Sequence, residues 1–183
     1  MDGDSLHIVT GAPGTGKTTV LECLGGEIQR FPEPAREILA QQRAVGGAGT
    51  PDRDRSVFVE LLLRRSIENH QEATRRGGNT LFDRGVPDCV AYAVVLGVDP
   101  SPSLLAVERY RYARDVLVFE PWPAIYTTDD ERTMAFDDVV RFHQEIVSVF
   151  ERTGYALVSV PRGSIEDRAA FVRGFILDAA PDA

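Results

Sequence analysis

Gly11-Ala12-Pro13-Gly14-Thr15-Gly16-Lys17-Thr18 is the stretch of sequence that decides the fold of this chain. It fits the pattern G-x-x-x-x-G-K-[ST], in which a glycine-rich backbone turns several N–H groups toward one point. The apolar run Leu6 to Thr10 precedes it, and the helical pattern Lys17 to Leu24 follows it. A helix that begins there adds the partial positive charge of its N-terminus. The stretch therefore predicts a strand-to-helix loop that binds the phosphates of a nucleotide.

Two residues of this loop have separate expected roles. Lys17 is expected to reach the β- and γ-phosphates, and Thr18 is expected to ligate Mg²⁺. The alternative interpretation is a glycine-rich turn with an incidental lysine. The full set expected to contact the nucleotide is Gly11, Ala12, Pro13, Gly14, Thr15, Gly16, Lys17, Thr18 and Thr19.

Short apolar runs alternate with longer amphipathic segments along the rest of the chain. Strands are expected at 28–31, 80–83, 116–119 and 156–160, and helices at 35–45, 53–76, 87–96, 102–112, 133–153 and 164–179. This alternation predicts βαβ units, and hence an α/β fold with a parallel sheet and helices on both faces. In such sheets the ligand binds beyond the carboxyl ends of the strands. We expect a single domain over residues 1–183.

Composition and charge narrow the function further. The chain has 183 residues and a formal net charge of −8, so it repels phosphate backbones and no nucleic-acid partner is expected. The acidic start Met1-Asp2-Gly3-Asp4 does not resemble a signal peptide, and no apolar run is long enough to span a membrane. Two cysteines make no disulfide framework. These features predict a cytoplasmic protein without a membrane partner.

A second candidate site residue stands at the end of the apolar strand Thr80 to Asp83. Asp83 stands at the end of that strand, where a carboxylate that holds Mg²⁺ is expected, and an ordinary helix-cap aspartate is the alternative. Arg84 comes next and can clamp a phosphate with its planar guanidinium, with a surface salt bridge as the alternative.

The sequence resembles the predicted-ATPase P-loop family that is related to the ribosylnicotinamide kinase domain, within the broader nucleoside-kinase-like group. The resemblance runs over most of the chain. It rests on Gly11 to Thr18, Glu33-Pro34-Ala35-Arg36-Glu37, Phe82-Asp83-Arg84-Gly85, Pro121-Trp122-Pro123-Ala124-Ile125-Tyr126, Asp129-Asp130-Glu131-Arg132 and Tyr155 to Pro161. It implies a P-loop kinase-like fold with a parallel sheet of about five strands.

The same resemblance assigns a role to Glu33. Deoxynucleoside kinases have a Glu-Pro pair after the second strand that supplies the base for the substrate hydroxyl, and Glu33-Pro34 looks like that pair. A first-turn glutamate favoured by the helix dipole is the alternative. Arg36 and Glu37 also match the pattern of these kinases. They either face the substrate or form an ion pair on the surface of the helix.

Kinases of this kind close a lid that contributes arginine, and the resemblance places the lid around residues 126–134. Arg132 is the only arginine there, and it is the lid candidate. The neighbouring carboxylates Asp129, Asp130 and Glu131 can neutralise it, so a solvated charge run is the competing interpretation. Trp122, the only tryptophan, either lines the substrate crevice or covers the edge of the sheet.

These features together predict a kinase that depends on ATP and Mg²⁺. It would transfer the γ-phosphoryl group to a hydroxyl of a small molecule, such as a nucleoside-like or sugar-bearing compound, with Lys17, Glu33, Asp83, Arg84 and Arg132 as the catalytic set. The competing hypothesis is a regulatory ATPase or GTPase switch that a protein partner reads. Glu33 separates the two, because a switch needs no acceptor base. The acceptor, the choice of ATP over GTP and the oligomeric state stay open.

Overall fold

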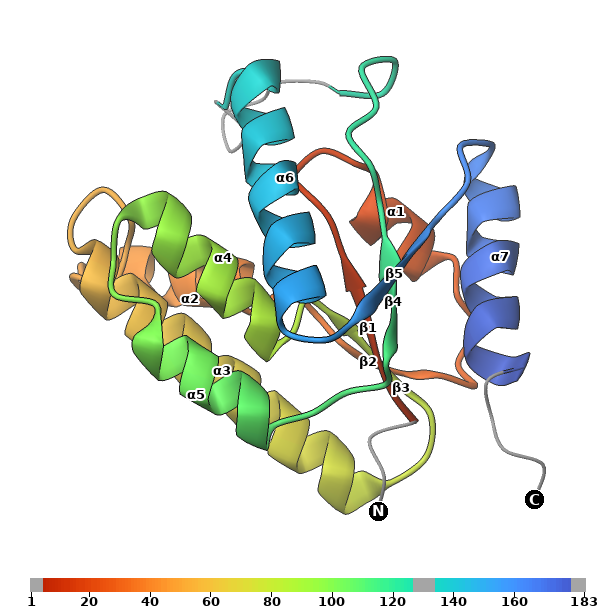
Figure 1. Ribbon diagram of the computed structural model, residues 1–183, viewed down its shortest axis with the longest axis horizontal. Helices are drawn as coiled ribbons and strands as arrows, with labels where there is room; N and C mark the ends of the chain where they lie inside the picture. The colour runs from red at the N-terminus through yellow and green to blue at the C-terminus, as the bar shows by residue number, and fades with distance from the viewer. Residues whose placement is uncertain (1–4, 127–133, 179–183) are drawn as a thin grey trace.

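The computed structural model describes residues 5–126 and 134–178 (Figure 1). Its strands are β1 (Leu6–Thr10), β2 (Gln29–Phe31), β3 (Thr80–Asp83), β4 (Asp115–Val118) and β5 (Ala156–Ser159). Its helices are α1 (Lys17–Glu22), α2 (Pro34–Val45), α3 (Arg55–Arg76), α4 (Val86–Leu96), α5 (Ser101–Arg109), α6 (Phe136–Arg152) and α7 (Ile165–Asp178). The alternation of strands and helices that the sequence predicts is therefore confirmed.

The five strands form one parallel sheet in the order β2-β3-β1-β4-β5. In the register of the central strands, Val9 of β1 lies beside Asp83 of β3, and Thr10 lies beside Val118 of β4. The carboxyl ends of the three strands therefore meet at one edge of the sheet. The chain leaves that edge through the predicted phosphate loop after β1, through Arg84 after β3 and toward Trp122 after β4.

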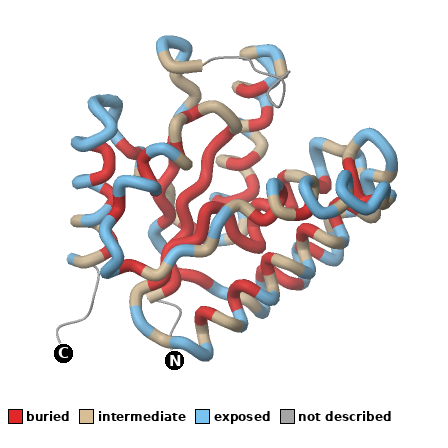
Figure 2. Tube along the Cα trace, turned by 180° about the vertical axis from the view of Figure 1, so that it is seen from behind, coloured by how far each residue is buried: buried red, intermediate tan, exposed pale blue. Residues whose placement is uncertain are grey.

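Helices cover both faces of the sheet, with α1 and α7 on one face and α3, α4 and α6 on the other (Figure 1). Side chains alternate between the faces along each strand. Ile8 of β1 packs into the cluster beneath α4 and α6, whereas the next residue, Val9, packs beneath α1 and α7. Because both faces are buried, the strands read as continuous apolar runs, and the buried trace in Figure 2 follows them through the middle of the molecule.

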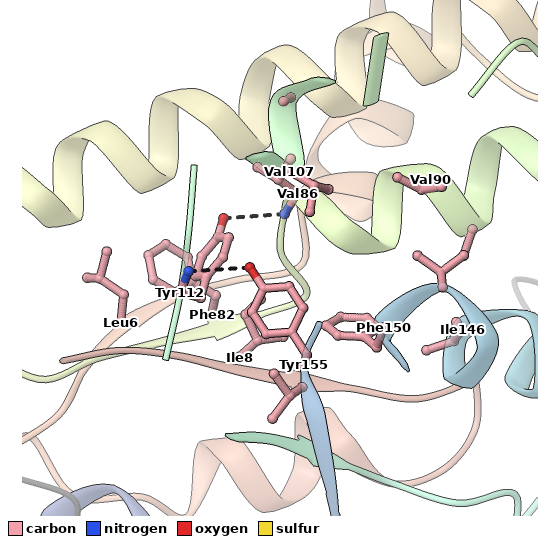
Figure 3. Close-up of a cluster of buried hydrophobic side chains, with 14 of the residues drawn as sticks. Leu6, Ile8, Phe82, Val86, Val90, Val107, Tyr112, Ile146, Phe150 and Tyr155 are labelled. Atoms are coloured by element: carbon pink, nitrogen blue, oxygen red, sulfur yellow. Dashed lines mark hydrogen bonds between the residues drawn. The ribbon is translucent and has the colours of Figure 1, made fainter. Parts of the chain in front are cut away.

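The end of α5 differs from the expected helix at 102–112. The helix ends at Arg109, and Tyr112 lies beyond it, buried in the core (Figure 3). There its hydroxyl accepts a hydrogen bond from the backbone N–H of Val86, and its own N–H donates to the hydroxyl of Tyr155. Tyr112 fits the apolar spacing of the preceding helix, and for this reason the sequence predicts a helix that extends to it. In the structure its hydrogen bonds hold it in the core beneath the start of α4, beyond the end of the helix.

The expected fold class, an α/β fold with a parallel sheet of about five strands, is therefore confirmed. Within residues 5–126 and 134–178, no helix is both long enough and apolar enough to cross a membrane.

Candidate nucleotide and acceptor site

The predicted phosphate loop follows β1 directly, and all three of its glycines, Gly11, Gly14 and Gly16, have positive φ. Gly11 has φ +131°, and a Cβ placed there would lie 2.2 Å from the carbonyl oxygen of Phe119. Gly16 has φ +80°, stands just before α1, and faces the guanidinium of Arg168 at 2.8 Å from an added Cβ. Side chains are excluded at both positions, so the loop backbone itself forms the wall of the site.

Lys17 begins α1 and turns back over this loop. Its ammonium donates hydrogen bonds of 2.9 Å to the carbonyls of Gly11 and Ala12, and it is only 6% exposed. Burial, followed by the nearby charge of Arg84, lowers the pKa of Lys17 to about 8. A buried ammonium held by carbonyls of the loop is available to an anion that enters the same space.

Asp83 ends β3, and it lies beside Val9 of β1, two residues before the loop begins. It is buried, and its Oδ1 has no hydrogen-bond partner among the residues that the structure describes. Burial raises the pKa of this carboxyl, while the positive charge of Lys17 opposes the rise. A buried carboxylate oxygen without a partner is costly, and a cation bound at that oxygen removes the cost.

Arg84 follows Asp83 and adopts φ +73°, a left-handed conformation that is unusual for a residue other than glycine. Its guanidinium is 3% exposed and bridges two carboxylates, with Nε 2.7 Å from Glu33 and Nη1 3.1 Å from Asp88. It also lies over the rings of Tyr92 and Phe142. The surrounding ion pairs and rings hold the strained residue in place.

Glu33 is the residue before α2, and Pro34 follows it at the first helical position. Its side chain makes no cap hydrogen bond; it points across to Arg84, and its other oxygen lies 3.1 Å from Nε of Arg36. Burial alone would raise the pKa of Glu33, but Arg84, Lys17 and Arg36 outweigh it and lower this pKa to about 2. Glu33 is therefore an ionised carboxylate that faces the phosphate loop.

Asp88 completes the network from the first turn of α4. One of its oxygens accepts from the hydroxyl of Thr10 and from Arg84, and the other accepts from the N–H of Gly85 at 2.9 Å. A single 2% exposed carboxylate thus joins β1, the turn after β3 and α4. It fixes the guanidinium that in turn holds Glu33.

These side chains line one cleft of about 870 Å³. Residues that follow β1, β2, β3, β4 and β5 all contribute to it, so it lies beyond the carboxyl ends of the strands, as the topology predicts. The lining residues are Pro13, Gly14, Thr15, Gly16, Lys17, Thr18, Thr19, Glu33, Ala35, Arg36, Leu39, Ala40, Arg43, Arg84, Tyr92, Trp122, Ile125, Gly163, Ser164, Ile165, Glu166 and Arg168.

One end of the cleft is built from α7 and the segment after β4. Arg168 of α7 is buried, and its Nη2 donates to the carbonyl of Thr15 in the phosphate loop at 2.7 Å. Its guanidinium lies over the rings of Phe119 and Trp122. Trp122 therefore lines the cleft, which was one of its two expected places.

The structure brings together most of the residues that the sequence singles out. Lys17, Thr18, Glu33 and Arg84 line the cleft, whereas Asp83 is buried at the end of β3 and is not among its lining residues. Glu37 lies elsewhere, because both of its oxygens accept from Arg65 of α3 at 3.0 Å. Arg132 and the acidic run beside it lie outside the described residues, so the lid stays a prediction.

Asp88 and Arg168 were not among the residues expected from the sequence. Asp88 stands four residues after Arg84, the spacing that brings side chains together on a helix. Arg168 stands four residues before Val172 and eight before Ile176, which are both buried, so a charged residue interrupts an apolar stripe of α7. Both signals are present in the sequence, but each is weak by itself.

The substitution Asp88→Asn is expected to destabilise the fold by about 2–4 kcal/mol. It would leave the buried Arg84 with one carboxylate instead of two, and breaking a buried pair costs more than its net stabilisation. Urea unfolding measures the change. The matched control is Asp138→Asn, which breaks an exposed pair with Arg141 and is expected to change the free energy of unfolding by less than about 0.5 kcal/mol. Equal effects of the two substitutions would contradict a structural role for the buried network.

Fold and cleft define the class as a P-loop protein of the kinase-like type, with a phosphate loop, a carboxylate at the end of β3 and an adjoining pocket. A family model described as an AAA domain matches residues 6–168. The chain belongs to this family, and the expected P-loop, nucleoside-kinase-like relationship is confirmed.

Solved structures with the same fold include three whose lengths the chain covers almost completely. The YorR protein from Bacillus subtilis, in complex with phosphorylated GDP, has a TM-score of 0.60 at 16% identity, with 94% of this chain and 95% of that one covered. Thymidylate kinase from Ehrlichia chaffeensis has a TM-score of 0.57 at 14% identity, with 96% and 100% covered. Deoxyadenosine kinase from M. mycoides has 0.59 at 11% identity, again with 96% and 100% covered. No curated protein matches the sequence significantly.

Proposed function

We propose that this protein is a small-molecule kinase that transfers the γ-phosphoryl group of ATP to a hydroxyl. The observation that carries the proposal is the ion pair between Glu33 and Arg84, which shares one cleft with the phosphate loop. A nucleotide switch needs the loop but not a held carboxylate beside it. A kinase needs both, since the acceptor must be positioned against the transferring group.

In the proposed reaction, the acceptor oxygen forms a bond to the γ-phosphorus while the bond from that phosphorus to the β-phosphate oxygen breaks and ADP leaves. Lys17 and the loop amides bind the phosphates, and Glu33 accepts a hydrogen bond from the acceptor hydroxyl. With a pKa of about 2, Glu33 is a weak base. Its contribution is therefore mainly to orient the hydroxyl, whose proton leaves late in a loose transition state.

The described residues fit a bound Mg²⁺. Asp83 has a buried oxygen without a partner, and Thr18 lines the cleft at the start of α1. The structure describes no group of three or more His, Cys, Asp or Glu side chains that could hold a metal. Mg²⁺ in phosphate-binding sites takes few protein ligands and completes its shell with phosphate oxygens and water. Bound there, Mg²⁺ would neutralise charge on the phosphates.

The state of Glu33 also favours a hydroxyl acceptor over a phosphate acceptor. An ionised carboxylate accepts a hydrogen bond from a neutral hydroxyl, but it has no proton to donate to the oxygens of a phosphate dianion. Among the proteins of similar fold are a thymidylate kinase and a deoxyadenosine kinase, so the fold alone does not choose between the two acceptors.

The test is a screen of paired acceptors with ATP and Mg²⁺, in which product mass is measured. Each nucleoside or sugar is tested beside its own monophosphate, in which the hydroxyl that is expected to react already carries a phosphate. The proposal predicts phosphorylation of hydroxyl compounds and little or none of the monophosphates. Preferential phosphorylation of the monophosphates would contradict a hydroxyl acceptor. Nucleotide hydrolysis with no phosphorylated acceptor would favour the switch instead.

A further inference from the structure

We propose that the acceptor carries an anionic group, such as a phosphate or carboxylate, at the end away from the reacting hydroxyl, and that Arg43 binds it. The inference rests on the proposed kinase function and specifies the class of its substrate. It comes from the wall of the cleft that α2 provides.

One face of α2 lines the cleft through Arg36, Leu39, Ala40 and Arg43. These residues follow the spacing i, i+3, i+4, i+7, so they form a single row along the helix. At 1.5 Å per residue, the row is about 10 Å long. It begins beside Glu33 and runs away from it, so the cleft continues along α2 past the transfer site.

The two arginines of this row differ in their partners. Nε of Arg36 is 3.1 Å from Glu33, so this arginine belongs to the transfer site. Arg43 makes no ion pair within 4 Å with any residue that the structure describes. The exposed Asp52 lies near enough for the charge of Arg43 to contribute to the lowering of its pKa, after the larger effects of Thr50 and the Asp52 backbone. Lys17 and Arg168 also lack an ion pair with a described residue, but both donate hydrogen bonds to carbonyls of the phosphate loop. Arg43 makes no such hydrogen bond within the described residues, so its guanidinium is available to a ligand.

The residues in the middle of this row and the charge of the whole cleft both fit an acceptor that carries an anionic group. Leu39 and Ala40 stand between the arginines and offer an apolar wall to the body of the acceptor. Among the residues that the structure describes, five cationic side chains and two carboxylates, Glu33 and Glu166, line the cleft, although the chain as a whole carries a net charge of −8. The nucleotide phosphates account for the positive charge near Lys17, but not for Arg43 at the far end of α2.

The experiment measures kcat/KM for neutral and anionic members of matched acceptor pairs, thymidine with thymidine 3′-monophosphate and uridine with orotidine. Both members of each pair keep the same 5′-hydroxyl. We expect wild type to prefer the anionic member by about five- to tenfold, the size of one partly exposed charge-assisted contact. Arg43→Glu is expected to reverse the preference, mainly through KM.

Arg75→Glu is the matched control, because it makes the same change of charge on α3 without lining the cleft. It is expected to keep the wild-type preference. An equal neutral-to-anionic ratio in wild type, or a ratio that Arg43→Glu leaves unchanged, would overturn the inference alone. Phosphorylation of neither member of any pair would overturn the proposed function and this inference with it.

Discussion

Replacing Lys17 with alanine is expected to lower turnover of ATP by about 10²–10³-fold and to weaken nucleotide binding. The ammonium turns back over the phosphate loop, where it donates hydrogen bonds of 2.9 Å to the carbonyls of Gly11 and Ala12. An alanine leaves the loop backbone intact but removes the charge that binds the transferring phosphoryl group. Loss of one such contact in a site that excludes water costs about two to three orders of magnitude in rate.

Calorimetry with Mg-ATP and a turnover assay measure both parts of this prediction. Glu22→Ala is a useful control, because Glu22 is exposed at the end of the same helix and does not line the cleft. It is expected to bind Mg-ATP within about threefold of wild type. Urea unfolding of both variants separates a loss of binding from a loss of fold. Wild-type affinity and turnover in folded Lys17→Ala would contradict the assignment of the phosphate loop.

The second large effect is expected for Glu33→Gln, which should slow phosphoryl transfer by about 10²–10⁴-fold, the usual range for a residue that handles the proton of the nucleophile. Glutamine keeps the shape of the side chain but accepts a weaker hydrogen bond from the acceptor hydroxyl. It also removes the charge that holds Arg84 at 2.7 Å. The affinity for Mg-ATP should change by less than about threefold, since other groups bind the phosphates.

Glu37→Gln is the matched control for this variant. It makes the same substitution four residues further along, in the first turn of α2, but Glu37 faces Arg65 of α3 and does not line the cleft. Single-turnover transfer to a confirmed acceptor should proceed in this control at close to the wild-type rate. Equal rates in Glu33→Gln and wild type would leave Glu33 as a helix-start carboxylate. The switch hypothesis would then gain support.

Much of the fold follows from local patterns in the sequence. Strands that are buried on both faces read as apolar runs, such as Leu6 to Thr10, and helices read through their amphipathic spacing. Boundaries are less predictable, because they depend on contacts with distant residues. Tyr112 illustrates this, since the core beneath α4 takes it out of the helical pattern and gives it Val86 and Tyr155 as partners.

The candidate site also has residues that the sequence predicts and partners that it does not predict. Lys17, Asp83 and Glu33 can be singled out because each stands next to a local signal: a loop motif, a strand end or a Glu-Pro pair. The partners of these residues cannot be read from sequence. Glu33 and Arg84 are 51 residues apart, and Arg168 lies 153 residues from Thr15. Such pairings depend on strand order, which a single sequence does not specify.

A kinase must pass the γ-phosphoryl group to a hydroxyl and not to water. Phosphorus-31 NMR of the wild-type reaction with ATP, Mg²⁺ and the acceptor found in the screen tests it most directly. If the protein is a kinase, a phosphate monoester resonance grows in equal amount with ADP, and little inorganic phosphate forms. Growth of inorganic phosphate in equal amount with ADP, and no monoester, would contradict it.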